Sequence, residues 1–448
     1  MFSISEAEAR VSDLVAAARK AGADTSDALY VCNASTNVSV RLGALEDVER
    51  SEGEEIGLRV FVGRRSASVS SSDLSAEALA ALVERATAMA REAPEDPYAG
   101  LAPEDRLLRG DPPELDSDDG ANPPSADLRA RALAAEDAAR AVAGVTNSEG
   151  GGASASRTVF ALATSHGFTR GYSASGYGCS ASVIAGEGGG MQRDYAYHSA
   201  RHVADLEDAA TIGRRAAERA VARLDPGKLA SGAMPVLLDP RVGSSILGHL
   251  TGAITGSSIA RRTSFLLDSL GGQIFAKGIM IRDDPHLPRG LRSRPFDGEG
   301  LPTAPTDIIA DGVLTGWLME SASARQLGLQ PTGHASRGVG GPPGVGTSNL
   351  YMAAGALSPE DLMADIKLGL FVTELIGQGV NGVTGDYSRG ASGFVIRDGR
   401  IAEPVAEITV AGNLKDMFLQ LTPASDLEFR HAVNVPTLRI EGLTVAGA

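Results

Sequence analysis

The sequence predicts an α+β fold, with an N-terminal α/β-layered part followed by a mostly antiparallel, strand-rich C-terminal part. Three observations lead to this prediction. Helix, strand and helix patterns follow one another over residues 1–91, and the same order recurs before residue 228. Strand patterns dominate from residue 229 onward. The chain of 448 residues is also long for a single core, so we expect one domain over 1–228 and another over 229–448.

Local patterns predict the first helix–strands–helix unit. Ser5 and Glu8 have the spacing of a capping box. Apolar residues then recur at helical spacing, at Val11, Leu14, Val15 and Ala18. Strands are predicted over 27–32, 37–42 and 55–62, where valine-rich runs alternate with other residues. A second helix is predicted over 75–91.

A proline-rich, acidic stretch over 92–125 separates this unit from the next, and we expect it to be an ordered crossing loop. A helix is predicted over 126–142, and strands follow between 158 and 197, including 158–164 and 177–185. A helix over 206–224 then ends at Asp225-Pro226-Gly227. The recurring order is that of a duplicated unit, although no repeat of individual residues is visible.

Turn chemistry defines the C-terminal part. A short apolar strand is predicted over 235–238. Asp311-Gly312 and Asp398-Gly399 each stand between apolar runs, and this dipeptide favours the positive φ angles of a tight hairpin. Ser358, followed by Pro359 and Asp361, indicates the start of one short helix.

Composition excludes several classes of function. The formal net charge of −15 disfavours binding to a nucleic-acid backbone. No stretch is long and apolar enough to span a membrane, and the acidic N-terminus does not resemble a secretory signal. The two cysteines, Cys32 and Cys179, lie far apart in strand-like runs. We therefore expect buried free thiols in a cytoplasmic protein.

Histidines are the first candidates for metal chemistry. His198 and His202 are four residues apart, but Ser199 stands where a zincin has its glutamate, and the flanking residues alternate like a strand. His249 follows the strand over 235–238 in a helix of small residues, without a second ligand or a base nearby in sequence. His198 and His202 are more simply explained as surface or loop histidines, and His249 as a histidine satisfied inside a helix-packing interface. Asp386 and Arg389 either brace a turn, or Arg389 recognises a peptide terminus.

Several segments together resemble the PmbA/TldE family, the partner side of the TldD–TldE pair, long labelled modulators of DNA gyrase. Residues 248–254 read GHLTGAI and are followed by TSFLLDSLG over 263–271. Next come PHL over 285–287 and RPFDGEG over 294–300. The last are GDYSRGASGF over 385–394 and AGNLKDM over 411–417, which contains Asn413. The resemblance is dense from 235 to 417.

The resemblance implies a cytoplasmic complex in which a TldD-like subunit binds zinc through a His-Glu-x-x-x-His helix and a later cysteine, and cleaves short unstructured peptides in a closed chamber. His249 matches the first histidine of that motif, whereas Leu250 and Ile254 occupy the glutamate and second histidine positions. No cysteine follows Asn413. Since leucine cannot act as a base and one imidazole cannot hold zinc, we expect no catalytic or metal-binding residue and no cofactor in this chain.

The leading hypothesis is therefore a metal-free subunit that completes the chamber of a TldD-like zinc partner and aligns an unstructured peptide. The candidate substrate or interface residues are His249, Asp386, Arg389 and Asn413. Apolar packing around Ile246, Leu250 and Ile254 is expected either inside the subunit or at its interface. Two alternatives stay open. One is a non-enzymatic regulator of a gyrase or toxin–antitoxin pathway, acting as a homodimer. The other is a divergent hydrolase that uses either a serine or a metal site built from His198, His202 and carboxylates, so activity of the lone chain is undecided.

Overall fold

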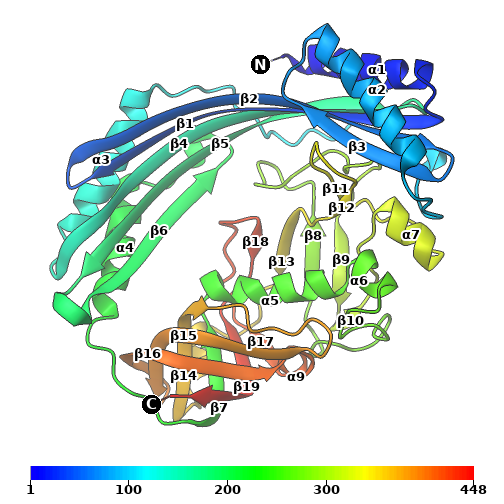
Figure 1. Cartoon of the computed structure of the whole chain (residues 1–448). Helices are drawn as coiled ribbons and strands as arrows, with labels where there is room; N and C mark the ends of the chain where they lie inside the picture. The colour runs from blue at the N-terminus through cyan, green and yellow to red at the C-terminus, as the bar shows by residue number, and fades with distance from the viewer. Residues whose placement is uncertain (1, 448) are drawn as a thin grey trace.

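One long, curved sheet forms the N-terminal half of the molecule and arches over the C-terminal half (Figure 1). The computed structural model describes residues 2–447. The six strands of the sheet are in the order β3-β2-β1-β4-β5-β6. Its elements are α1 (Ile4–Lys20), β1 (Thr25–Arg41), β2 (Ala44–Val62), β3 (Arg65–Ser71), α2 (Ala76–Glu92), α3 (Ser125–Arg140), β4 (Val145–Thr164), β5 (Thr169–Ala185), β6 (Gln192–Ala200) and α4 (Ala209–Ala222).

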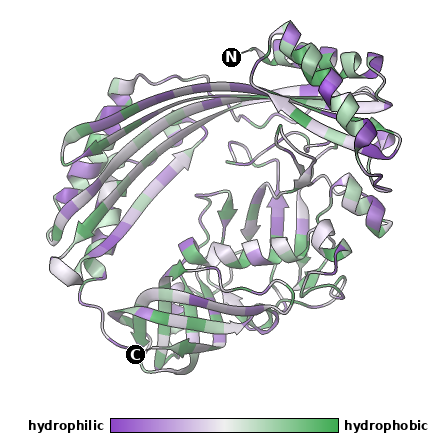
Figure 2. Cartoon of the chain, viewed as in Figure 1, coloured by the Kyte–Doolittle hydropathy of each residue, from purple (hydrophilic) through white to green (hydrophobic). Residues whose placement is uncertain are grey.

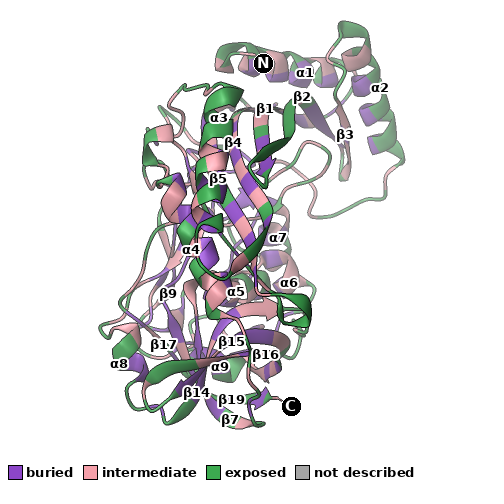
Figure 3. Ribbon diagram, turned by 90° about the vertical axis from the view of Figure 1, so that its left-hand side faces the viewer, coloured by how far each residue is buried: buried purple, intermediate pink, exposed green. Residues whose placement is uncertain are grey.

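The order helix, three strands, helix occurs twice in this half, as the sequence pattern indicated. The two units meet where β1 pairs with β4 in antiparallel register, so each unit adds its other strands outward from this central pair. The four helices cover the convex face, and their outer surfaces are exposed while their buried residues face the strands (Figure 3). The concave face is consequently turned toward the C-terminal half (Figure 1).

Several local predictions are wrong in register or length. The strands expected over 55–62 and 158–164 are only the last parts of β2 and β4, which begin at Ala44 and Val145. The capping box of α1 is formed by Ser3 and Glu6, not by Ser5 and Glu8, because both pairs have the required spacing and only the earlier one starts the helix at Ile4. The strands expected over 27–32 and 37–42 are one continuous strand, β1. Its polar middle pairs with β2 and β4 on both sides, and these neighbours stabilise a stretch whose own propensity is low.

The segment between the two units is ordered, as expected. A short 3-10 helix, η1 (Glu104–Arg106), is its only regular element among the described residues. The Arg325 side chain donates to the carbonyl oxygens of Tyr98, Gly100 and Leu101 at 2.8–3.0 Å. The Leu108 amide donates to Gly300 O at 2.9 Å. These bonds attach the crossing segment to the C-terminal half.

The C-terminal half contains two main sheets and confirms the α+β class. A five-stranded sheet has the order β10-β9-β8-β13-β18, and a six-stranded sheet has the order β16-β15-β14-β7-β19-β17 and closes on itself through β16 and β19. Strands of the closed sheet are largely hydrophobic, whereas β6 is largely hydrophilic (Figure 2). The strands are β7 (Gly232–Leu238), β8 (Ile281–Asp284), β9 (Thr306–Ala310), β10 (Val313–Leu314), β11 (Ala335–Ser336), β12 (Gly344–Val345), β13 (Asn349–Met352), β14 (Leu368–Ile376), β15 (Asp386–Arg397), β16 (Arg400–Asn413), β17 (Leu421–Pro423), β18 (Val433–Asn434) and β19 (Leu438–Ala446).

The predicted turns of this half are confirmed. Asp311-Gly312 joins β9 to β10 and Asp398-Gly399 joins β15 to β16, and all four residues have positive φ. Ser358 and Asp361 form the capping box of α8 (Pro359–Met363). The other helices are α5 (Pro240–Ala253), α6 (Gly256–Ala260), α7 (Ser321–Leu327) and α9 (Leu414–Leu419). Most pairings are antiparallel, but β7 runs parallel to β14, and β13 to β18.

A buried charge cluster joins the concave face to the C-terminal half. Asp27 of β1 accepts hydrogen bonds from Arg59 of β2 and from Arg337, which lies in the loop after β11. Desolvation opposes ionisation of Asp27, yet the two guanidinium groups hold the pKa of its carboxyl below the usual value. The two halves are therefore joined by a contact that depends on paired charges.

Two further findings bear on the class of protein. Among residues 2–447, no helix is long and apolar enough to cross a membrane. Cys32 and Cys179 are both free and buried, as expected. Burial raises the pKa of both thiols, to about 11 for Cys179, so neither is a ready nucleophile.

Candidate functional site

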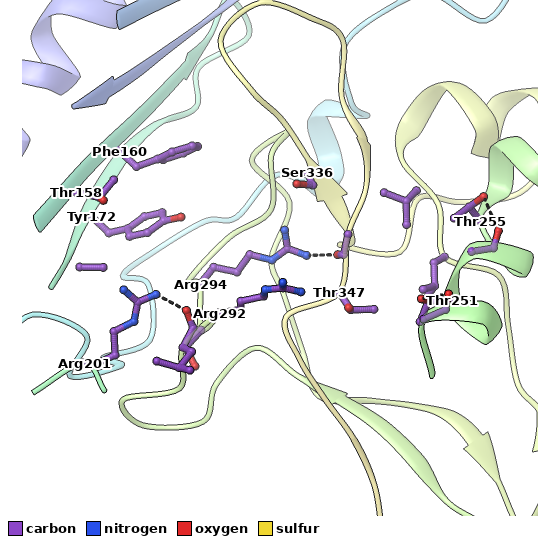
Figure 4. Close-up of a pocket in the computed structure, with 18 residues that line it drawn as sticks. Thr158, Phe160, Tyr172, Arg201, Thr251, Thr255, Arg292, Arg294, Ser336 and Thr347 are labelled. Carbon is purple, nitrogen blue, oxygen red and sulfur yellow. Dashed lines mark hydrogen bonds between the residues drawn. The ribbon is translucent and has the colours of Figure 1, made fainter. Parts of the chain in front are cut away.

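A pocket of about 610 Å³ lies between the concave face of the sheet and helix α5. The sheet contributes Phe160 of β4 and Tyr172 of β5, whose rings stack with centroids 5.1 Å apart. The opposite wall is one face of α5. No carboxylate is found among the described residues that line this pocket, whereas three arginines are, Arg201, Arg292 and Arg294 (Figure 4). The pocket is therefore positively charged in a protein that is acidic as a whole.

The faces of α5 explain which of its residues reach this pocket. Its turns of 3.6 residues bring Gly248, Thr251, Gly252 and Thr255 (the residue that caps α6) to one side, and these four line the pocket. Ile246, Leu250 and Ile254 lie on the opposite side and are fully buried in the core of this chain. A Cβ atom added at Gly248 or Gly252 would meet nothing within 4 Å. The helix wall is thus open because its side chains are small.

The three arginines differ in how far they are already engaged. Arg294 donates to Ser348 Oγ, Ala335 O and Gly346 O at 2.7–3.0 Å. Arg201 donates to Ser175 O at 2.8 Å and to Leu291 O, while its buried Nε has no partner. The Arg292 side chain has no hydrogen-bond or ion-pair partner among the described residues (Figure 4). Arg292 is therefore the guanidinium most available to a ligand.

A second pocket of about 680 Å³ continues the first along α5. Leu291 and Arg292 line both pockets, and Arg241 and Ser244 extend the same face of the helix. From Arg241 to Thr255 the helical rise corresponds to roughly 21 Å. At about 3.4 Å per residue, an extended peptide of about six residues has this length. We refer to the two joined pockets as the α5 groove.

Two of the four candidate residues lie together, next to the α5 groove but not in its lining. His249 packs edge to face against Tyr387 of β15, with ring centroids 5.9 Å apart. Burial, with a smaller contribution from the Arg389 charge, lowers the pKa of His249, so the imidazole is neutral at neutral pH. Within the part of the chain that the structure describes, His249 Nε2, Tyr387 Oη and Arg389 Nε have no hydrogen bond of normal geometry.

The other two candidate residues form a separate, exposed turn contact. Asn413 Nδ2 donates to Asp386 Oδ1 and to Thr384 O, each at 3.1 Å. Asn413 also caps α9 by accepting from the Lys415 amide. Asp386 accepts in addition from Thr384 Oγ1 at 2.6 Å. Asp386 therefore braces a turn through Thr384 and Asn413, and not through the pair with Arg389 that was weighed from the sequence. Neither Asp386 nor Asn413 lines the α5 groove.

His198 and His202 do not share a helical face. His198 lies in β6 and its Nδ1 accepts from the Glu207 amide at 3.1 Å. His202 follows the strand and contacts Asp116 through Nε2, with 2.9 Å to the carbonyl oxygen. In the described part of the chain, no group of three or more His, Cys, Asp or Glu side chains could hold a metal ion.

The sequence did not identify the residues that line the groove. Phe160 alternates with buried residues, a pattern typical of any half-buried sheet, and Tyr172 lies in a run of partly buried residues without alternation. Arg292 follows proline and glycine residues without a recognisable motif. The available signal was the glycines at 248, 252 and 256. Their spacing indicates that another group lies close to this helix face, but it does not identify that group.

Comparison with known proteins covers nearly the whole chain. Models of three domains of the PmbA/TldA metallopeptidases match it: domain 1 over residues 27–90, the central domain over 118–224 and the C-terminal domain over 231–447. The chain is 40% identical over 452 residues to the metalloprotease PmbA of Escherichia coli O157:H7, which covers 99% of this chain and 98% of the relative. It is 37% identical over 442 residues to a PmbA homologue of Haemophilus influenzae, covering 98% and 95%.

A TldD homologue of Haemophilus influenzae is a more distant relative, 25% identical over 257 residues and covering 53% of each chain. Two solved structures have the same fold. One, from Bacteroides thetaiotaomicron and described as a modulator of DNA gyrase, is 26% identical with a TM-score of 0.91 over 99% of both chains. The other, TldE from Thermococcus kodakarensis, is 20% identical with a TM-score of 0.85, covering 98% of this chain and 100% of that one, and shows the fold alone.

Proposed function

The chain belongs to the PmbA/TldD family of metallopeptidases, and from this premise we propose that it is a metal-free subunit that holds the peptide for a zinc-binding TldD-like partner. The identity of 40% to a PmbA protein along the full length, against 25% to a TldD homologue over about half, supports the PmbA/TldE side of the pair. The cytoplasm is the compartment that we propose for it, because both cysteines are free.

One observation carries the proposal: α5 lines a groove with small residues, whereas the corresponding helix of a zinc subunit would supply metal ligands. Leu250 and Ile254, at the positions of the expected base and second histidine, are fully buried in the core. A metal bound by side chains at these two positions would have to lie inside that core. Glycine and threonine instead face the groove, so this helix supplies space and hydroxyl groups. Such a wall can orient a peptide but cannot activate water.

The dimensions and chemistry of the α5 groove suit an extended peptide. The stacked rings of Phe160 and Tyr172 provide an apolar platform, and Arg292 provides an unpaired cation at the junction of the two pockets. The edge strand β6 contributes Tyr195, Tyr197 and Ser199 to the second pocket. The Tyr195 carbonyl already accepts a hydrogen bond from Arg219. A peptide strand added to this edge would therefore pair with the main chain of β6 near Tyr197 and Ser199.

The proposal is tested by purifying this chain alone and after co-expression with a TldD-like subunit, then measuring bound zinc and cleavage of an unstructured peptide. We expect neither zinc nor cleavage with the lone chain, and both with the pair. Replacing Gly252 by phenylalanine in this chain should lower cleavage by the pair without changing its zinc content, because the new ring fills the groove and not the metal site.

Two results would overturn the assignment. One is zinc-dependent cleavage by the lone chain. The other is a stable homodimer that forms no complex with the TldD-like subunit, which would instead favour the regulatory alternative. Direct binding to a DNA duplex is disfavoured by the net charge of −15.

A further inference from the structure

A third, smaller cavity of about 280 Å³ lies where the α5 groove meets the closed sheet. It shares Tyr195 and Arg241 with the second pocket, so it continues the groove beside the first turns of α5, where Val242 and Ser245 line it. Its inner wall consists of Thr373 of β14 and Arg389 of β15.

Two residues of its wall, Thr373 and Arg389, carry buried polar atoms that have no hydrogen-bond partner among the described residues. Thr373 is only 9% exposed, and its Oγ1 has no hydrogen-bond partner among the described residues. The same is true of Arg389 Nε. Tyr387, behind Arg389, is 2% exposed and its Oη also lacks a bond of normal geometry, although Arg389 is close enough for its charge to oppose the rise in pKa that burial causes. Buried polar groups are usually satisfied, so a gathering of unsatisfied donors indicates a place for a ligand.

The charges around the cavity leave one cation uncompensated. Arg223 is paired with Asp194 and Glu374, and Arg241 with Asp194 and Asp239. Arg193 is paired with Glu149. Arg389, in contrast, makes a long contact of 3.4 Å from Nη2 to Leu375 O and has no carboxylate partner within residues 2–447. A partly buried guanidinium of this kind is stabilised by an anion that it can bind through two donors.

We propose that this cavity binds a carboxylate, held by the Arg389 guanidinium and by the Thr373 hydroxyl. The source that we propose, which rests on the function proposed above, is the C-terminal carboxylate of the peptide in the α5 groove. A monoanion fits better than a phosphate dianion, because Asp194 and Glu374 also line the cavity and repel a second negative charge. His249 and Tyr387 act as positioning residues for the Arg389 side chain, since their rings pack against each other and both lie close enough to feel its charge.

The test uses the full chain and two versions of one unstructured peptide, with either a free C-terminal carboxylate or a C-terminal amide. Affinity is measured by calorimetry for the wild type, Arg389→Gln, Thr373→Val and the control Arg214→Gln, which alters an exposed arginine of α4. We expect the wild type and the control to bind the free acid on the order of tenfold or more tightly than the amide. In Arg389→Gln the two peptides should bind equally, with the affinity for the amide unchanged. Thr373→Val should reduce the difference.

Each failure has a distinct meaning. Equal binding of acid and amide by the wild type, or a preference that persists in Arg389→Gln, overturns the carboxylate site and leaves the peptide groove standing. Absence of binding by both peptides overturns the groove, and the cavity is then tested with acetate and inorganic phosphate alone. Acetate binding that Arg389→Gln abolishes supports the carboxylate site independently of any peptide. Tighter binding of phosphate than of acetate overturns it.

Discussion

Arg241 of α5 donates to Asp194 of β6 at 3.0 Å, and this contact joins the helix of the groove to the edge strand of the arched sheet. Asp194 is nearly fully buried and also pairs at 3.4 Å with Arg223, the residue that caps the C-terminus of α4. Arg223 in turn reaches Glu374 of β14. The relative position of the two walls of the groove therefore depends on one buried carboxylate.

The first prediction concerns this carboxylate. Asp194→Asn leaves two partly buried guanidinium groups without their shared counter-ion, so we expect a loss of about 3 kcal/mol in the free energy of unfolding, measured by urea denaturation. The control is Glu403→Gln, which removes the partner of Arg397 from a largely exposed pair and should cost less than about 1 kcal/mol. Equal effects of the two variants would show that the Asp194 contact does not hold the halves together.

The second prediction concerns the open face of α5. Gly252→Ala should raise the free energy of unfolding by roughly 0.5–1 kcal/mol, because alanine favours the helix and its Cβ meets no neighbour. Gly252→Phe should keep the melting temperature within a few degrees of the wild type but weaken peptide binding at least tenfold, since the ring occupies the groove.

The matched control is Ala81→Phe, on the exposed side of α2 and away from the groove. It should change neither stability nor peptide binding. If peptide binding to Gly252→Phe equalled that of the control, the peptide would not lie along α5.

The third prediction follows from two histidines beside the second pocket. Burial, and then the charge of Arg430, lower the pKa of both His198 and His431 below 6.5. Well above pH 6.5, both histidines are neutral in the folded and in the unfolded chain. As the pH falls below 6.5, the unfolded chain takes up protons that the folded chain resists, so these groups stabilise the fold at neutral pH and lose that contribution on acidification.

We therefore expect the wild type to lose stability between pH 7 and pH 5, and the double variant His198→Gln/His431→Gln to lose less over the same interval. Thermal unfolding at a series of pH values measures both slopes. The same slope in both proteins would mean that the two imidazoles titrate alike in the folded and unfolded chain.

Sequence patterns were sufficient where one local signal decides the structure. Asp311-Gly312 and Asp398-Gly399 predicted their hairpins because few other residues adopt the required backbone. They were insufficient for β1, whose polar middle is strand only because β2 and β4 flank it. The order β3-β2-β1-β4-β5-β6, which makes one sheet of two units, depends on pairings between residues more than a hundred positions apart.

The candidate site was predicted only in part, because local motifs were visible in the sequence and long-range contacts were not. The motif positions on α5 revealed what the chain lacks, because Leu250 and Ile254 can be compared with a ligand pattern residue by residue. His249 and Arg389 were both singled out, but only the packing of α5 on β15 places them around Tyr387. Arg292 and Thr373 carried no sequence signal. They matter because their side chains line a pocket without a hydrogen-bond partner among the described residues, and only the folded structure reveals this.

The last prediction asks whether the metal site could be restored by side chains alone. The double variant Leu250→Glu/Ile254→His recreates the His-Glu-x-x-x-His order with His249, but both replaced residues are fully buried. A buried carboxylate without a partner and a lost apolar contact should together cost several kcal/mol, so we expect a chain that unfolds at much lower urea and retains no zinc by mass spectrometry. The control, Gly248→Glu/Thr251→His, places the same residue types on the open face and should fold with near wild-type stability. If the first variant folded normally with one zinc per chain, α5 would be able to turn these positions toward a metal, and the argument from the buried face of this helix would fail.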